Sequence, residues 1–142
     1  MRLGKKLGVL FLLGLAATGA VQAGLPSSVW QGVYTSGQAN RGKAHYEAHC
    51  AECHGVTLEG SDTAPELNGG TFVANWDGLS AGELFTRIRT SMPANNPGSL
   101  GDEIVTDVMA YLFSVNQFPA GSTELPKDPG ALKQIGITKA AH

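Results

Sequence analysis

The sequence predicts a small all-α domain, and three stretches carry this prediction. "SGQANRGKAHYEAHC" (36–50) is rich in Ala, Lys, Arg, Gln and Glu, which favour helix. "SAGELFTRIRT" (80–90) opens with Ser and Glu three residues apart, as in a capping box, and continues with an apolar face. "DEIVTDVMAYLFSV" (102–115) repeats apolar residues at helical spacing. The 142 residues and 42% apolar content suit one domain with a modest core.

The stretch "MRLGKKLGVLFLLGLAATGAVQAG" (1–24) predicts an export signal rather than part of this domain. Three basic residues precede an apolar run, and Val21 and Ala23 fit a cleavage site of the A-x-A kind. We expect cleavage after Ala23, a periplasmic location and no membrane span in the mature chain. The alternative is an uncleaved membrane anchor, for which the apolar run is rather short.

The charge of the exported chain limits its partners. Without the signal, seven Lys and Arg face twelve Asp and Glu, a net charge of −5. Nucleic acid would repel such a chain, so we expect no nucleic-acid partner.

Both cysteines of the chain lie in "HCAECHG" (49–55), as Cys50 and Cys53, and His54 follows directly. Paired cysteines in an oxidising compartment usually form a disulfide. A disulfide here would close a very short loop and stabilise little. A thioredoxin-like redox pair needs a βαβ context, and no alternating strand pattern precedes Cys50. A structural zinc site needs a fourth ligand, and no second Cys pair exists.

One interpretation uses all three residues of this motif. C-x-x-C-H is the attachment motif of c-type haem, in which each thiol forms a thioether with a haem vinyl group. On a helix, Cys50, Cys53 and His54 share one side, so His54 can reach the iron. We therefore predict one covalent haem c, with the two cysteines as anchors and His54 as the proximal ligand.

The second axial ligand decides whether the iron is open or closed. Met109 lies in the apolar stripe of 102–115, where Met usually fills core space. Met92 precedes Pro93, which should end the preceding helix near Thr90 and leave Met92 on an extended loop. A thioether suits this iron, so we predict Met92 as the distal ligand, with a mere plug of the haem crevice as its alternative.

"CAECHG", then "SMP" and a last helix containing "AYL", resemble the class I c-type cytochromes over residues 38–115. Longer stretches such as "LFTRIRTSMPANNPGSL" look like the single-haem periplasmic cytochromes that accompany bacterial quinoprotein dehydrogenases. The resemblance implies the class I cytochrome c fold, with three to five helices packed round one covalently bound haem.

The resemblance also implies roles for single residues. Gly42 and Tyr46 match the first helix of the family's crossed pair, and Tyr111 with Leu112 the last helix. Pro65 matches the proline whose carbonyl accepts the proximal imidazole N–H.

Trp76 matches an aromatic residue whose N–H reaches a haem propionate, and ordinary core packing is its alternative. Arg87 and Arg89 could also pair with propionates, although solvated helix charges are the more common case. His45 and His49 are interpreted as exposed helix residues rather than iron ligands.

The predicted organisation has four segments, which are a cleaved signal peptide (1–23), an N-terminal leading segment (24–37), the haem domain (38–116) and a C-terminal extension that wraps the domain (117–142). The extension carries three prolines in "NQFPAGSTELPKDPGALKQIGITKAAH" and little periodicity.

Closed iron favours electron transfer, so we predict an electron carrier rather than an enzyme. Its donor would be a dehydrogenase or a quinol-linked complex, its acceptor a respiratory oxidase or another cytochrome, and its state a monomer or a weak complex. The alternatives are a peroxidase-like enzyme or gas sensor with a displaceable sixth ligand, and a fixed haem subunit of a dehydrogenase complex.

Overall fold

The computed structural model describes residues 26–139, and the predicted export signal lies outside them. The described chain is helical, with the order η1 (Val29–Gln31, a 3-10 turn), α1 (Ser36–His49), α2 (Ala51–His54), α3 (Gly69–Trp76), α4 (Ala81–Ser91), α5 (Asp102–Val115) and α6 (Pro129–Lys133). The all-α class is confirmed. In this range the six α-helices exceed the expected three to five by one, because the count includes α2 and α6, which are only about one turn long. No helix in the described range is long and apolar enough to cross a membrane.

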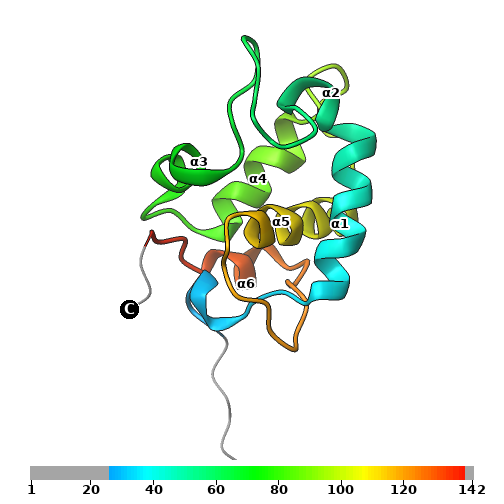
Figure 1. The fold of residues 1–142 in the computed structure, drawn as a ribbon. Coiled ribbons are helices and arrows are strands. Elements are labelled where there is room, and N and C mark those ends of the chain that lie inside the picture. The colour runs from blue at the N-terminus through cyan, green and yellow to red at the C-terminus, as the bar shows by residue number, and fades with distance from the viewer. Residues whose placement is uncertain (1–25, 140–142) are drawn as a thin grey trace, which may run out of the picture.

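Helices α1 and α5 cross each other, with α5 in the middle of the domain and α1 along one side (Figure 1). Gly42 of α1 packs directly on the Asp107 backbone of α5, where a side chain would overlap the carbonyl group. One turn later Tyr46 meets Tyr111, with ring centroids 5.4 Å apart. The glycine allows the two backbones to approach closely, and the tyrosines fill the space beside them.

The ends of the helices that border the site follow from local sequence. Ser80 and Glu83 form a capping box at the start of α4, with the Ser80 N–H donating to the Glu83 carboxylate at 2.8 Å. Helix α4 ends at Ser91, one residue beyond the expected position, and Met92 is extended at φ −120° and ψ 153°. Helix α5 begins after Gly101, with two acidic residues in its first turn that suit the helix dipole.

The two ends of the described chain pack together away from the crossing. The Trp30 indole N–H donates to the Thr138 carbonyl at 2.9 Å, and the Gly136 N–H donates to the Ser27 carbonyl at 2.8 Å. Five apolar residues of the C-terminal extension are buried in the core, which are Phe118, Leu125, Leu132, Ile135 and Ile137. The extension therefore completes the core, although its sequence has little periodicity.

A buried carboxylate ties α1, α5 and the extension together. Asp107 is 2% exposed, and its carboxylate accepts two hydrogen bonds from Arg41, at 2.9 and 3.0 Å. Arg41 also donates two bonds of 3.0 Å to Glu124. These bonds, to Asp107 first and Glu124 second, raise the pKa of Arg41 above its ordinary value. Pairing of this kind is what makes a buried charge tolerable.

We predict that Gly42→Ala destabilises the fold strongly, because the new Cβ would overlap the Asp107 carbonyl and force α1 and α5 apart. The loss of unfolding free energy should be about 2 kcal/mol or more in a urea titration. Gly37→Ala is the matched control on the same helix, where a Cβ meets only the Thr35 hydroxyl at 3.8 Å. That change should be neutral or stabilising by up to about 1 kcal/mol. Equal midpoints for the two variants would contradict the close crossing.

Candidate functional site

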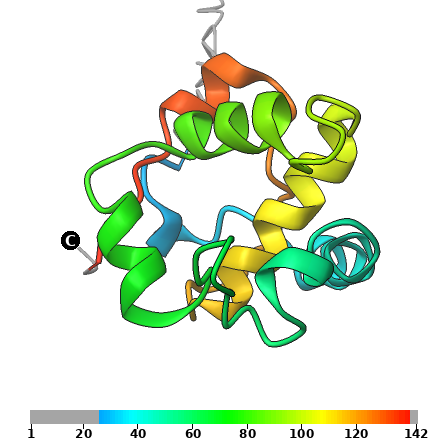
Figure 2. The same ribbon diagram turned by 90° about the horizontal axis from the view of Figure 1, so that it is seen from above.

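A cavity of about 500 Å³ lies between the attachment motif, α3, α4 and α5. Figure 2 shows the ribbons of α2, α3, α4 and α5, each of which supplies lining residues, arranged in a ring. Apolar side chains make most of its wall, including Phe72, Leu84, Ile88, Val108 and Leu112. Polar residues lie at its rim, namely His49, Glu52, Glu66, Asn75, Arg87 and Asn95. Such a space suits a large apolar group with a polar edge.

The attachment motif forms a separate helical turn. Helix α1 ends at His49, and Cys50 at φ −124° and ψ −34° interrupts it before α2 begins. The His54 N–H still donates to the Cys50 carbonyl at 2.9 Å, as in a helical turn. Cys50, Cys53 and His54 all line the cavity, so the expected one-sided arrangement exists despite the interruption.

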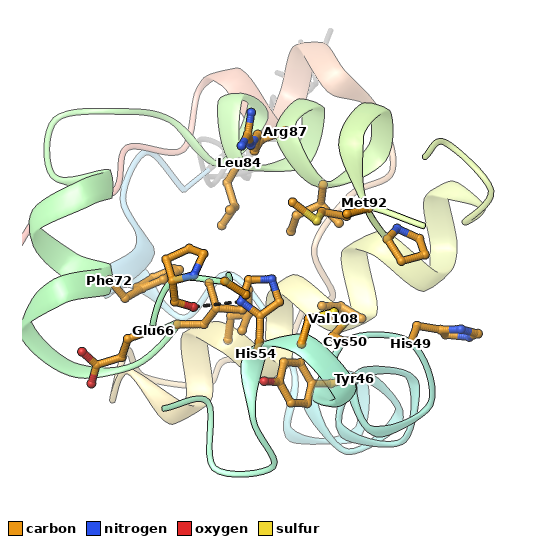
Figure 3. A pocket seen from close by; sticks show the side chains of 18 of the residues that line it. Tyr46, His49, Cys50, His54, Glu66, Phe72, Leu84, Arg87, Met92 and Val108 are labelled. Carbon is orange, nitrogen blue, oxygen red and sulfur yellow. Dashed lines mark hydrogen bonds between the residues drawn. The ribbon is translucent and has the colours of Figure 1, made fainter. Parts of the chain in front are cut away.

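The imidazole of His54 is held in a defined orientation. His54 is 8% exposed, and its Nδ1 lies 2.8 Å from the Pro65 carbonyl oxygen. Because a carbonyl can only accept, Nδ1 carries the proton, and the lone pair that a neutral imidazole offers to a metal is then on Nε2. The ring points into the cavity (Figure 3). This arrangement presents Nε2 to a metal and fixes the ring by its other nitrogen.

Met92 lies on the opposite side of the cavity from His54 (Figure 3). The Met92 N–H donates to the Ile88 carbonyl at 3.0 Å, so the end of α4 holds the methionine backbone. Met109, in contrast, is completely buried and is not among the cavity residues. The structure thus places one thioether at the cavity and the other in the core.

The geometry gives little support to the three other uses of the cysteines. Cys50 and Cys53 are not bridged. Burial first, and the neighbouring Cys53 second, raise the pKa of the Cys50 thiol to about 11, whereas redox-active thiols have a lowered pKa. Residues 26–139 contain no group of three or more His, Cys, Asp or Glu side chains placed to hold a metal ion, as zinc would require.

The structure separates residues that the sequence left equivalent. Arg87 lines the cavity, whereas Arg89 donates to Asp102 at 2.7 Å and to the Gly98 carbonyl at 2.8 Å. Trp76 also lines the cavity, and its ring centroid lies 6.4 Å from that of Phe72. His49 reaches only the rim and points outward (Figure 3).

Helix α3 is the element that sequence reasoning missed. It supplies Phe72, Asn75 and Trp76 to the cavity, yet no side-chain cap marks its start. The spacing of Phe72, Val73 and Trp76 was the available signal, because it places the three on one helical face.

Comparison with known proteins identifies the family. The profile of the family described as cytochrome c oxidase, cbb3-type, subunit III matches residues 37–112, more than half of the chain. The chain belongs to this family. It is a class I c-type cytochrome, as the motifs predict, and its work is haem-based electron transfer.

A solved structure supports the same fold for this cytochrome. The match is to the crystal structure of the sulfane dehydrogenase SoxCD from Paracoccus pantotrophus, with a TM-score of 0.50 and 21% identity. It covers 84% of this chain and 68% of that chain. No curated protein matches the sequence significantly.

The cavity fits the haem c that this family implies. A cavity-facing Nε2, two thiols one helical turn apart and apolar walls meet the needs of a covalently held haem. The thioether on the opposite side could serve as a sixth ligand.

We predict that Gly60→Ala loosens the segment that carries Pro65. Gly60 has φ +75°, and a Cβ there would lie 2.6 Å from the Glu66 nitrogen and 2.8 Å from the Pro65 carbonyl carbon. Gly78→Ala is the control, because Gly78 has φ +82° but open space around it. Both variants should lose about 1 to 2 kcal/mol of unfolding free energy from backbone strain. Gly60→Ala should lose a further 1 to 3 kcal/mol, roughly, in urea titrations of the haem-loaded protein. Identical losses of unfolding free energy in the two variants would mean that the segment around Pro65 moves aside for the new Cβ without cost.

Proposed function

We propose that this cytochrome is a periplasmic one-electron carrier whose single covalent haem c is held between His54 and Met92. The observation that carries the proposal is the placement of these two side chains on opposite sides of one apolar cavity. When bound, haem c supplies an iron that alternates between the ferrous and ferric states.

Four residues would bind this haem, each in a different way. Cys50 and Cys53 would anchor it through thioether bonds. The imidazole of His54 would hold the iron through Nε2, in an orientation set by the Pro65 carbonyl. Met92 would hold the iron as a soft ligand, which would favour the ferrous state and raise the reduction potential. Backbone hydrogen bonds hold both residues in place, from the His54 N–H to the Cys50 carbonyl and from the Met92 N–H to the Ile88 carbonyl, so we expect their positions to change little between oxidation states.

The walls and rim of the cavity set its polarity. Phe72, Leu84 and Leu112 keep water away from the interior and so favour the less charged, ferrous state. Arg87 is an exposed cation at the rim, and in the described part of the chain it has no ion-pair partner. Arg87 and the Trp76 N–H are the groups we assign to the haem propionates.

The distribution of charge indicates how a redox partner docks. Residues 44–86, which include α2 and α3, contain seven acidic residues and no Lys or Arg. A partner that approaches this side of the cavity should therefore present a basic patch, through a small and short-lived interface. The donor would be a dehydrogenase or quinol-linked complex, and the acceptor an oxidase or another cytochrome.

The second candidate function is that of a haem subunit fixed in a larger enzyme complex. The matching family is named for a subunit of an oxidase, and the similar fold occurs in a dehydrogenase. Stable co-purification with an oxidoreductase at moderate salt would favour this candidate, whereas a free monomer would favour the carrier.

We predict that Met92→Leu converts the haem to a high-spin, five-coordinate form with a lower reduction potential. Leucine keeps the volume of methionine but cannot bind iron, so the ferrous state loses its soft ligand. Met109→Leu is the matched control, because Met109 is buried in the core and does not line the cavity. Visible spectra and redox titration of both variants test the assignment. A low-spin spectrum and unchanged potential in Met92→Leu would refute Met92 as a ligand.

We also predict that electron exchange with a basic redox protein slows as salt is added, because screening weakens attraction to the acidic side. Glu52→Gln with Glu66→Gln, both at the cavity rim, should slow the reaction at low salt and flatten its salt dependence. Glu103→Gln is the control, since Glu103 is exposed but lies outside the cavity lining and forms only a surface pair with Lys127. Equal stopped-flow rates for the two sets of variants would place docking elsewhere.

A further inference from the structure

The segment that carries Pro65 is an irregular loop between α2 and α3. We call residues 55–68 the proximal loop. Most of its side chains are exposed, and Val56 is 69% exposed. Leu58 and Ala64 are its buried apolar residues. Because so little apolar surface of the loop is buried, its conformation must be stabilised largely by hydrogen bonds.

Tyr46 holds the first end of the proximal loop. Its hydroxyl donates to the Gly55 carbonyl at 2.7 Å, and Gly55 directly follows His54. The Tyr46 ring is completely buried beside Tyr111 in the crossing of α1 and α5. The closely packed crossing of α1 and α5 is thus connected to the residue next to His54.

Asn116 holds the other end of the loop. Its Nδ2 donates to the Leu67 carbonyl at 3.0 Å and to the Leu112 carbonyl of α5 at 2.9 Å. Its Oδ1 is buried without a hydrogen-bond partner. An unpaired buried acceptor lowers stability, so an apolar side chain would be less costly here. What the amide provides in return is a bond to the loop two residues beyond Pro65.

The bonds between these two ends connect them to His54. The Leu67 N–H donates to the Leu58 carbonyl at 2.9 Å, and the Gly60 N–H donates to the His54 carbonyl at 2.8 Å. Within residues 26–139, the side chains outside the loop that hydrogen-bond to it are Tyr46, His54 and Asn116. The position of the Pro65 carbonyl therefore depends on Tyr46 and Asn116.

We propose that Tyr46 and Asn116 are positioning residues that hold the Pro65 carbonyl against His54 and thereby set the reduction potential. The proposal rests on the proposed function, because it takes His54 as an iron ligand. A firm Nδ1–H bond to a carbonyl makes the imidazole a stronger donor and favours the ferric state. Loosening either end of the loop should weaken this bond and raise the potential.

Tyr46→Phe tests the proposal with the loss of a single hydroxyl. Tyr34→Phe is the matched control, because the buried Tyr34 hydroxyl donates to the Phe118 carbonyl at 2.6 Å and Tyr34 does not line the cavity. Both variants should lower the urea midpoint of the haem-loaded protein. Only Tyr46→Phe should raise the potential and speed exchange of the His54 Nδ1 proton, measured by NMR, by about fivefold.

Asn116→Leu is the second variant, since leucine has a similar volume and no donor. It should also raise the potential and speed Nδ1 exchange, while stability changes little because the unpaired Oδ1 is removed. The double variant should shift the potential by less than the sum of the single shifts, because both act through one bond.

The proposal is wrong if Tyr46→Phe and Asn116→Leu match Tyr34→Phe in potential and in Nδ1 exchange. Failure of the proposed function would instead be visible in the unmodified protein, whose ferrous haem would then bind carbon monoxide. The two failures are therefore distinguishable.

Discussion

The hydrogen bond between His54 Nδ1 and the Pro65 carbonyl connects the fold to the chemistry of the site. At 2.8 Å it determines which imidazole nitrogen carries the proton, and it leaves Nε2 free on the cavity side. It also joins His54, the residue directly before the proximal loop, to Pro65 near the far end of that loop. Every element that positions one of these two groups therefore contributes to the properties of the haem.

The crossing of α1 and α5 supplies the rigid frame for this contact. Gly42 brings the helices together, and the next turn of α1 places Tyr46 beneath the attachment turn. The end of α5 places Asn116 beside Leu67. Helix α4, which starts at a capping box and ends at Ser91, brings Met92 to the opposite side of the cavity. Packing far from the iron thus decides how both ligands are presented.

Features with local causes could be predicted from the sequence. The attachment motif lies within one helical turn, and the end of α4 follows from Pro93, so His54 and Met92 were identified as candidates from their neighbours alone. The Pro65 contact came only from resemblance, because a backbone carbonyl eleven residues away has no side-chain signature. Asn116 and the separation of Arg87 from Arg89 were missed, since both depend on contacts between distant segments.

The measurement that tests the central claim most directly is the visible spectrum of the unmodified protein, ferric and then ferrous, with and without carbon monoxide. If His54 and Met92 close the iron from both sides, the ferric protein shows a weak band in the red from sulfur ligation, and carbon monoxide leaves the ferrous spectrum unchanged. A high-spin spectrum, or prompt binding of carbon monoxide, would contradict the account. Met92 would then only fill the haem crevice, and the protein would be suited to peroxide or gas chemistry rather than to electron transfer alone.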